Sequence, residues 1–136
     1  KKWSIPYLIL NNNDSLSEDK VLIKLRNHKI NLILLAGYMK ILSKKFIRTF
    51  GKSILNIHPS LLPKYKGLNT FEKVLKKKEK KTGCTVHFVT EKLDEGKIIL
   101  KKSFYIDKKD DVASLRKKTQ NLEYNAFSEA IIKVMR

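Results

Sequence analysis

Cysteine is almost missing from this sequence, which contains Cys84 alone among 136 residues. One cysteine cannot form an intramolecular disulfide, so an oxidising compartment gains no support. Long apolar runs are missing too: the longest, residues 30–39, is interrupted by Asn31 and is too short to span a bilayer. The amino end has no signal-peptide pattern. We therefore expect a cytoplasmic location and no membrane partner.

Arginine is scarce although the chain is strongly basic, with a formal net charge of +17. Of the 30 basic residues, the arginines are only Arg26, Arg48, Arg116 and Arg136. Proteins that read base edges depend on the bidentate guanidinium group. Lysine, asparagine and isoleucine, which are all abundant here, share A/T-rich codons, and this bias gives the charge another origin. We therefore expect no nucleic-acid partner, although the field should attract anionic substrates such as phosphates.

The chain also lacks an initiator methionine, so we expect that translation began upstream of Lys1. Its 136 residues, 42% of them apolar, fit a single domain spanning 1–136.

Apolar periodicity predicts alternating strands and helices. Strands are predicted at residues 4–10, 31–36, 53–57, 84–90 and 97–106. Helices are predicted at residues 15–28, 43–50, 69–80 and from 110 towards the carboxyl end. Ser15 and Glu18 form a capping-box signature, and Ser43 can cap the second helix. The lysine-rich run 76–81 is expected to be a solvated helix end.

The order of these elements indicates an α/β fold with a parallel core. Strand 31–36 is nearly continuous in its apolar character, which is typical of strands buried on both faces of a parallel sheet. Strands 84–90 and 97–106 could pair as a hairpin, and the last helix is long. Between strand 53–57 and the third helix, residues 59–67 form a loop of unusual length for a compact domain.

One constellation is suited to chemistry. Asn56 and His58 are two residues apart at the end of a strand, so both side chains project from the same face. Asp94 follows in a Gly-containing turn. An amide and a protonated imidazole can stabilise the oxyanion of an acyl-transfer intermediate, and a carboxylate can hold the imidazole charged and relay a proton. No nucleophilic side chain is required, so Cys84 need not be catalytic.

Each of these residues also has a structural interpretation. An Asn-x-His pair at a strand end is commonly a hydrogen-bonded structural pair, and Asp94 can be a turn former. His87 is expected to be a packed or surface residue. The three groups in order, with a two-proline loop between them, favour the catalytic interpretation.

These residues closely resemble the glycinamide ribonucleotide formyltransferases, which transfer a formyl group from 10-formyltetrahydrofolate to the amine of a phosphorylated substrate in purine synthesis. The resemblance rests on three ordered blocks, at residues 35–43, 56–67 and 85–100, and extends more loosely over the final helix. It implies a Rossmann-like fold with a mostly parallel central sheet, a carboxyl-terminal hairpin and a long helix. It also implies small-molecule substrates, no metal, and a monomer or homodimer.

The resemblance assigns roles to individual residues. Asn56, His58 and Asp94 match the catalytic trio, Gly67 matches the substrate-facing loop, and Glu123 matches a helix glutamate that contacts the acceptor. The segments expected to enclose the folate's pterin ring contain Met39, Lys40, Ile41, Leu42, Val89, Thr90, Glu91, Lys92 and Leu93. The peptide bond between Leu62 and Pro63 is expected to be cis.

The chain departs from the family pattern at several positions. Lys40 replaces an arginine, Lys66 a proline, Asn69 a histidine, and Tyr124 the histidine that usually follows the helix glutamate. The family also opens with a strand and a Gly-rich loop that binds the substrate phosphate at a helix start. No such segment occurs here, so we expect a formyltransferase domain that is incomplete at its amino terminus, exposes apolar surface and lacks most of the phosphate-binding site.

Three alternatives remain open. The formyltetrahydrofolate deformylases share the Tyr-Met-x-Ile-Leu-Ser block, but typically carry a small regulatory domain in front. The methionyl-tRNA formyltransferases share the proline-containing loop, but lack the Ala-Gly-Tyr-Met pattern and carry an extra carboxyl-terminal domain. A non-catalytic fragment that only binds folate or a partner is the third alternative.

Overall fold

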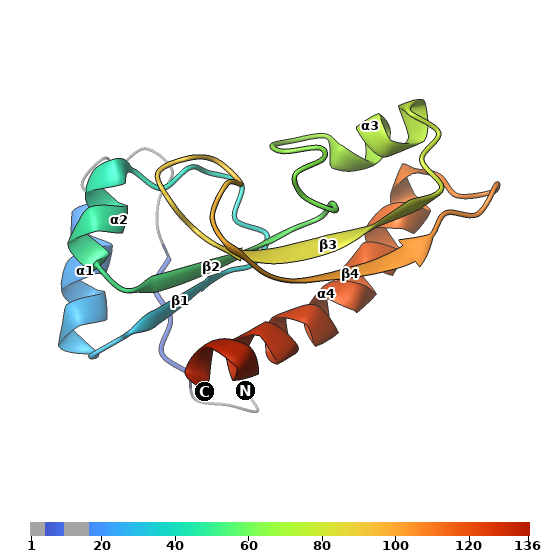
Figure 1. Cartoon of the computed structure of the whole chain (residues 1–136). Helices are drawn as coiled ribbons and strands as arrows, with labels where there is room; N and C mark the ends of the chain where they lie inside the picture. Colours follow the sequence, from blue (N-terminus) through green and yellow to red (C-terminus); the bar gives the residue numbers. More distant parts are fainter. Residues whose placement is uncertain (1–4, 10–16) are drawn as a thin grey trace.

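A four-stranded sheet in the order β1-β2-β3-β4 forms the centre of the protein (Figure 1). The computed structural model describes residues 5–9 and 17–136. Its strands are β1 (Leu32–Leu35), β2 (Ser53–His58), β3 (Lys81–Phe88) and β4 (Ile98–Tyr105). Its helices are α1 (Ser17–Asn27), α2 (Lys44–Phe50), α3 (Thr70–Lys76) and α4 (Val112–Met135).

The sheet is mixed, with its parallel part at the start. β1 pairs with β2 in parallel, whereas β2 with β3 and β3 with β4 are antiparallel. The β3–β4 ladder is irregular between Val86 and His87. The predicted α/β class, the carboxyl-terminal hairpin and the long final helix are confirmed.

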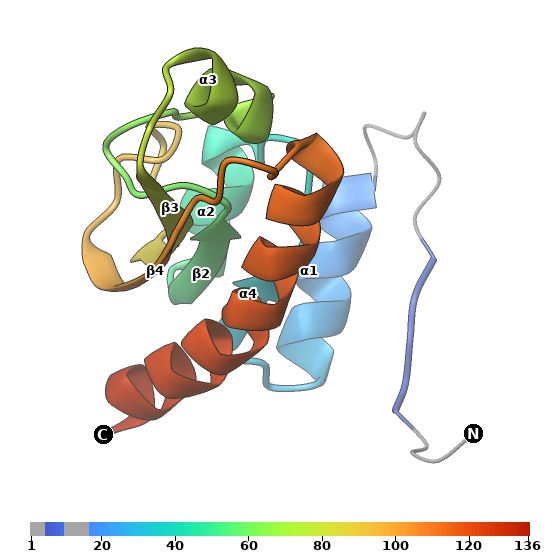
Figure 2. The ribbon, with the colours of Figure 1, turned by 90° about the vertical axis from the view of Figure 1, so that its right-hand side faces the viewer.

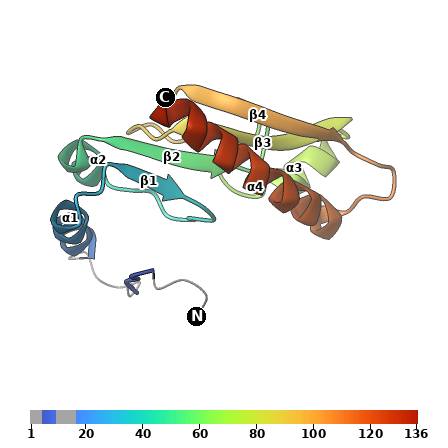
Figure 3. The ribbon, with the colours of Figure 1, turned by 90° about the horizontal axis from the view of Figure 1, so that it is seen from below.

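The long helix α4 runs obliquely along one face of the sheet and packs on β3 and β4 (Figure 3). Ala126 and Ala130 are both fully buried against the sheet core, where their small side chains allow the helix to approach closely. The strands contribute the rest of this cluster, which includes Leu55, Cys84 and Val86. A second cluster joins α3 to the first turns of α4, and α3 lies beside that end of α4 in Figure 2. The two clusters therefore pack helices α3 and α4 together with the β3–β4 hairpin.

A capping side chain starts α2 where the sequence predicts it, and another starts α4. The Ser43 hydroxyl accepts a hydrogen bond from the Phe46 amide, which satisfies one free donor of the first turn of α2. Glu18 of α1 accepts hydrogen bonds from the backbone and side chain of Ser43, and so joins the two helices. At α4, Asp111 and Ser114 form a reciprocal capping box.

The prediction of a strand at residues 4–10 is wrong for the residues that the structure describes. Residues 5–9 have no regular secondary structure, and the side chains of Ile5, Tyr7 and Ile9 are 73%, 77% and 77% exposed. A strand needs a neighbour for its backbone hydrogen bonds, and no described strand pairs with these residues. The predicted cap Ser15 lies outside the described residues.

Strand β1 is less buried than its composition predicts. Leu32, Ile33 and Leu35 are half-buried and Leu34 is 41% exposed. β1 is an edge strand of the described sheet, because its only partner there is β2. The expected exposure of apolar surface is therefore observed at this edge.

The boundary between the third helix and the following strand also differs from prediction. α3 ends at Lys76, not at residue 80, because Lys77 forms the cap and Lys78 adopts a left-handed conformation with φ of 51°. β3 begins at Lys81, three residues before the predicted start. The lysine-rich run 76–81 is mostly exposed, as expected, but only Lys76 and Lys77 belong to the helix end, and the residues that follow form the turn that enters β3.

Candidate active site

Asn56 and His58 lie at the carboxyl end of β2 and face the same side of the sheet, as predicted from their spacing. The antiparallel register sets Asn56 opposite His87 and His58 opposite Thr85 on β3. The edge of an open sheet at the carboxyl ends of its parallel strands is where α/β folds bind ligands.

The His58 side chain is 7% exposed and has a partner at each ring nitrogen. Nε2 lies 2.8 Å from the carbonyl oxygen of Tyr65, so this nitrogen donates. Nδ1 lies 3.5 Å from Oδ2 of Asp94. The Asp94 carboxylate and the Tyr65 carbonyl are both hydrogen-bond acceptors, and an imidazolium can donate to both because each of its ring nitrogens carries a proton.

Asp94 comes from the loop between β3 and β4, and its side chain is 5% exposed. It adopts a left-handed conformation with φ of 52°, which aspartate tolerates better than most residues. Its Oδ2 accepts a 2.9 Å hydrogen bond from the backbone of Gly67, and its Oδ1 lies 3.6 Å from Nε2 of His87. The structure therefore brings Asn56, His58 and Asp94 together.

His87 is the residue of this cluster that the sequence reasoning missed. As expected it is packed, at 2% exposed, but it lies within the site, between Asn56 and Asp94. Its Nδ1 donates to the Phe88 carbonyl at 2.9 Å, and its Nε2 lies 3.3 Å from the Asn56 amide nitrogen. Burial lowers the pKa of His87, which favours the neutral ring, whose Nε2 can accept from Asn56. Its position opposite Asn56 follows from the antiparallel β2–β3 register, which local sequence does not specify.

The loop at residues 59–67 is fixed by polar contacts of buried side chains. Thr85, which is fully buried, donates to the Ser60 carbonyl at 2.7 Å and accepts from the Leu62 amide at 3.0 Å. Ser60 in turn donates to the Lys64 carbonyl at 2.6 Å. The Leu62–Pro63 bond is cis, as expected. This support fixes the Tyr65 carbonyl and the Gly67 amide, which contact His58 and Asp94.

All the predicted site residues line one cavity of about 630 Å³. The candidate folate-binding residues form two groups in the chain, 39–42 and 89–93, and both groups contribute to the lining. Asn56 and His58 lie between the two groups in sequence, and Asp94 directly follows the second. Met39, Ile41 and Leu93 are 74%, 73% and 51% exposed, so the cavity offers apolar side chains to a flat ring. Gly67 lines it as well.

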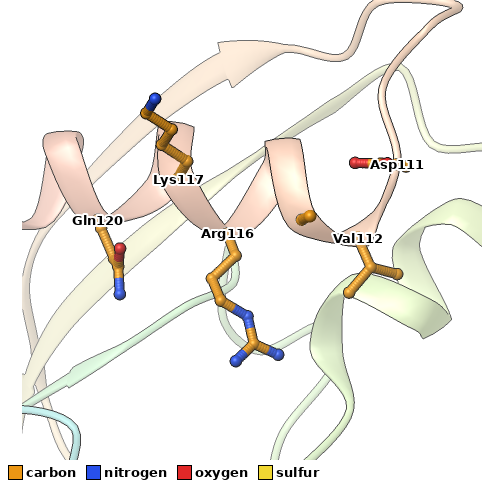
Figure 4. A pocket seen from close by; sticks show the side chains of 6 residues that line it. Asp111, Val112, Arg116, Lys117 and Gln120 are labelled. Atoms are coloured by element: carbon orange, nitrogen blue, oxygen red, sulfur yellow. The ribbon is translucent and has the colours of Figure 1, made fainter.

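Helix α4 forms the remaining wall through Arg116, Thr119, Gln120 and Glu123. Burial raises the pKa of Glu123. The hydroxyl of Thr119 is buried and has no hydrogen-bond partner among the described residues. Arg116 and Gln120 leave α4 on the same side, opposite to Lys117, and they also line a shallow hollow at the start of the helix (Figure 4). That hollow contains none of the predicted site residues.

Cys84 is fully buried in the sheet core, and burial raises the pKa of its thiol to about 12. A thiol in this state is not a nucleophile. The described residues contain no cluster of three His, Cys, Asp or Glu side chains suited to a metal ion. Within the same residues, no helix has the length and apolar character that crossing a membrane requires.

The sequence profile of the family described as formyl transferase matches residues 6–131. The chain belongs to the formyl transferase family. The match covers every described strand and all but the end of α4, so the residues that line the cavity all lie within the matched region.

Named relatives agree with this assignment. Over 103 residues the chain is 45% identical to a phosphoribosylglycinamide formyltransferase of Haemophilus influenzae, which covers 76% of this chain and 49% of that protein. The crystal structure of phosphoribosylglycinamide formyltransferase from Brucella melitensis aligns with a TM-score of 0.83 at 38% identity, covering 91% of this chain and 64% of that one. A formyltetrahydrofolate deformylase from Pseudomonas syringae aligns with a TM-score of 0.82 at 25% identity, covering 90% of this chain and 41% of that one.

The chain thus spans about half the length of the curated Haemophilus relative, at 49%. The region that matches the family, residues 6–131, includes Asn56, His58 and Asp94 and most of α4.

Proposed function

We propose that the protein carrying this chain transfers a formyl group from 10-formyltetrahydrofolate to the amine of glycinamide ribonucleotide, in purine biosynthesis. The observation that carries the proposal is the convergence of Asn56, His58 and Asp94, with contacts of 3.5 Å or less joining the last two to each other and to the loop 59–67. The family and the named relatives give the reaction class.

In the proposed reaction, the acceptor amine attacks the formyl carbon and the carbonyl oxygen becomes an oxyanion. Asn56 uses one N–H bond for His87, and its second N–H bond can donate to that oxygen. His58 has partners at both ring nitrogens, so it contributes chiefly the positive charge of its imidazolium. A buried charge of this kind stabilises an oxyanion more strongly than it would in water.

Asp94 keeps the imidazolium charged and accepts, through a water molecule, the proton that the amine loses. The intermediate then collapses: the bond from the formyl carbon to the folate nitrogen breaks, and that nitrogen takes up a proton. No side chain forms a covalent bond to the formyl group in this reaction, so no nucleophilic residue is needed, which agrees with the burial of Cys84.

The neutral state of His87 orients the other groups. A neutral ring that donates from Nδ1 to Phe88 must accept at Nε2, so the Asn56 amide presents its nitrogen and not its oxygen on this side. His87 is therefore proposed as a positioning residue for Asn56, and not as an acid or a base.

The two substrates occupy different walls of the cavity in this proposal. The folate ring lies between residues 39–42 and 89–93, where apolar side chains are exposed. The acceptor lies towards Gly67 and Glu123. No metal is required by this chemistry. The proposed location is the cytoplasm, where purine substrates and reduced folates are available.

One assay separates this function from the deformylase alternative. The natural gene product that contains this chain is incubated with 10-formyltetrahydrofolate, with and without glycinamide ribonucleotide. Formation of the formylated acceptor, with little formate when the acceptor is left out, supports transfer. Formate release that is independent of the acceptor would show a deformylase, and neither product, together with folate binding, would show a non-catalytic fragment.

A further inference from the structure

We propose that Arg48 is a positioning residue that holds the folate-lining loop against helix α2 and so sets the width of the donor slot. This inference rests on the proposed function, because the donor slot is defined by it. The relevant feature is a bidentate ion pair: Arg48 donates from Nε to Oε1 of Glu91 at 2.6 Å and from Nη2 to Oε2 at 3.0 Å.

The ion pair joins the two walls of the slot. Residues 39–42 form one wall and lead directly into α2, which carries Arg48 in its last turn. Glu91 belongs to the opposite wall, at residues 89–93. A contact between the walls fixes their separation, and a planar ring that binds between them requires a definite separation.

Helix α2 is a firm support for this contact. Its first turn is capped by Ser43, which is itself bonded to Glu18 of α1. Phe46 is 4% exposed and stacks on Phe50. The guanidinium therefore extends from a helix that is anchored at its start and along its buried face.

The loop, by contrast, has little backbone attachment. The last ladder-like contact before it is the amide of Val89, which donates to the Ile54 carbonyl at 2.8 Å. Within the described chain, no backbone–backbone hydrogen bond joins residues 90–95 to another element. The loop is held by side chains: Glu91 to Arg48, Asp94 to the Gly67 amide, and Glu95 to Lys66 at 2.9 Å.

These three tethers divide the loop into two functional parts. Asp94 and Glu95 are tied to the loop 59–67, so the catalytic carboxylate keeps its place without Arg48. Glu91 is the only one of the three tethered residues that lies within the donor-lining segment 89–93. Loss of the Arg48 contact should therefore weaken donor binding and leave the chemical step nearly unchanged.

The geometry explains why this pair matters although it is exposed. Most surface ion pairs contribute little, but a two-bond guanidinium–carboxylate pair is both stronger and directional. The hydrogen bonds from Arg48 are also the first cause of the lowered pKa of Glu91. The Arg48 side chain is 71% exposed, so the contact should be sensitive to salt.

The test compares Arg48→Ala with Lys45→Ala, a matched control on the same helix. Lys45 is 70% exposed and forms its ion pair with Asp19 of α1, away from the loop. Arg48→Ala should raise the KM for 10-formyltetrahydrofolate about five-fold, an order of magnitude typical of one exposed bidentate pair, with kcat and the acceptor KM within two-fold. Lys45→Ala should leave the donor KM, kcat and the acceptor KM unchanged. The double variant R48E/E91R should restore most of the donor affinity.

Two further readouts separate this inference from the proposed function. Amide exchange of residues 90–93, measured on this chain without any substrate, should accelerate in Arg48→Ala and not in Lys45→Ala. Tetrahydrofolate binding to the wild type should weaken at high salt towards the value of Arg48→Ala. If formyl transfer is absent but amide exchange changes as predicted, the proposed reaction is refuted and the positioning role of Arg48 is supported. Equal exchange and equal folate binding in both variants, or failure of the double variant to recover, would overturn the inference.

Discussion

The substitution Asp94→Asn isolates the charge of the carboxylate from its shape. The amide oxygen of asparagine can still accept the 2.9 Å hydrogen bond from Gly67, and asparagine tolerates the left-handed conformation at this position, with φ of 52°. The loop should therefore keep its place. What the variant loses is the negative charge that lies 3.5 Å from Nδ1 of His58.

The size of the effect follows from that distance and from burial. Side chains that are 5% and 7% exposed are poorly screened by solvent. Two unit charges at this separation attract by roughly 5 kcal/mol at an effective dielectric constant of about 20. If most of this attraction sustains the imidazolium during reaction, kcat should fall by about 10²–10³-fold, because ~1.4 kcal/mol corresponds to a factor of ten.

The assay is single-turnover formyl transfer with the donor saturating, alongside thermal unfolding of both proteins. Glu95→Gln is the matched control, since it removes the neighbouring charge, which pairs with exposed Lys66. This control should keep kcat within a few-fold. A kcat of Asp94→Asn equal to that of the control, with both proteins folded, would refute the reasoning.

Three further predictions concern the frame of the site. Burial raises the pKa of Glu123, so the contribution of its neutral carboxyl to stability is complete below the unfolded-state pKa and is lost as the pH rises through the folded-state pKa. Glu123→Gln should therefore raise the free energy of unfolding near pH 7, and raise it much less near about pH 3.5. Urea titrations at the two pH values would measure the difference. A Cβ added at Gly83 would lie 1.9 Å from the backbone carbonyl oxygen of Lys102, so Gly83→Ala should lower the free energy of unfolding by about 3 kcal/mol. At Gly37, where the space is open, substitution by Ala should cost about 1 kcal/mol. Equal losses of stability in the two variants would contradict the packing argument. Cys84, buried and with a pKa of about 12, should resist iodoacetamide in the native protein and react fully in guanidinium chloride, and fast native labelling would be the contrary result.

The sequence predicts the site better than it predicts the edges of the fold. Asn56, His58 and Asp94 are predicted as one group from residue type and order, and the structure brings their side chains to one cavity, whereas their catalytic roles stay a prediction. Strand and helix types from β1 to α4 are likewise recognised, because apolar periodicity reflects which side of each element is buried.

The errors arise where a distant neighbour decides the outcome. The apolar alternation at residues 4–10 fits a strand, yet residues 5–9 are not one in the described chain, because pairing needs a partner that local pattern does not reveal. Lys77 and Lys78 read as helix formers, but the chain must turn there to enter β3. His87 was missed as a site residue because its role depends on the β2–β3 register, which local sequence does not specify.

In the proposed mechanism His58, held between Tyr65 and Asp94, supplies the charge that drives formyl transfer. The most direct test is turnover of His58→Ala and His58→Gln in the natural gene product, with folate binding measured on the same samples. In both variants we expect turnover to fall by orders of magnitude and folate affinity to change only a few-fold. Turnover equal to that of the wild type in either variant would contradict the proposed mechanism.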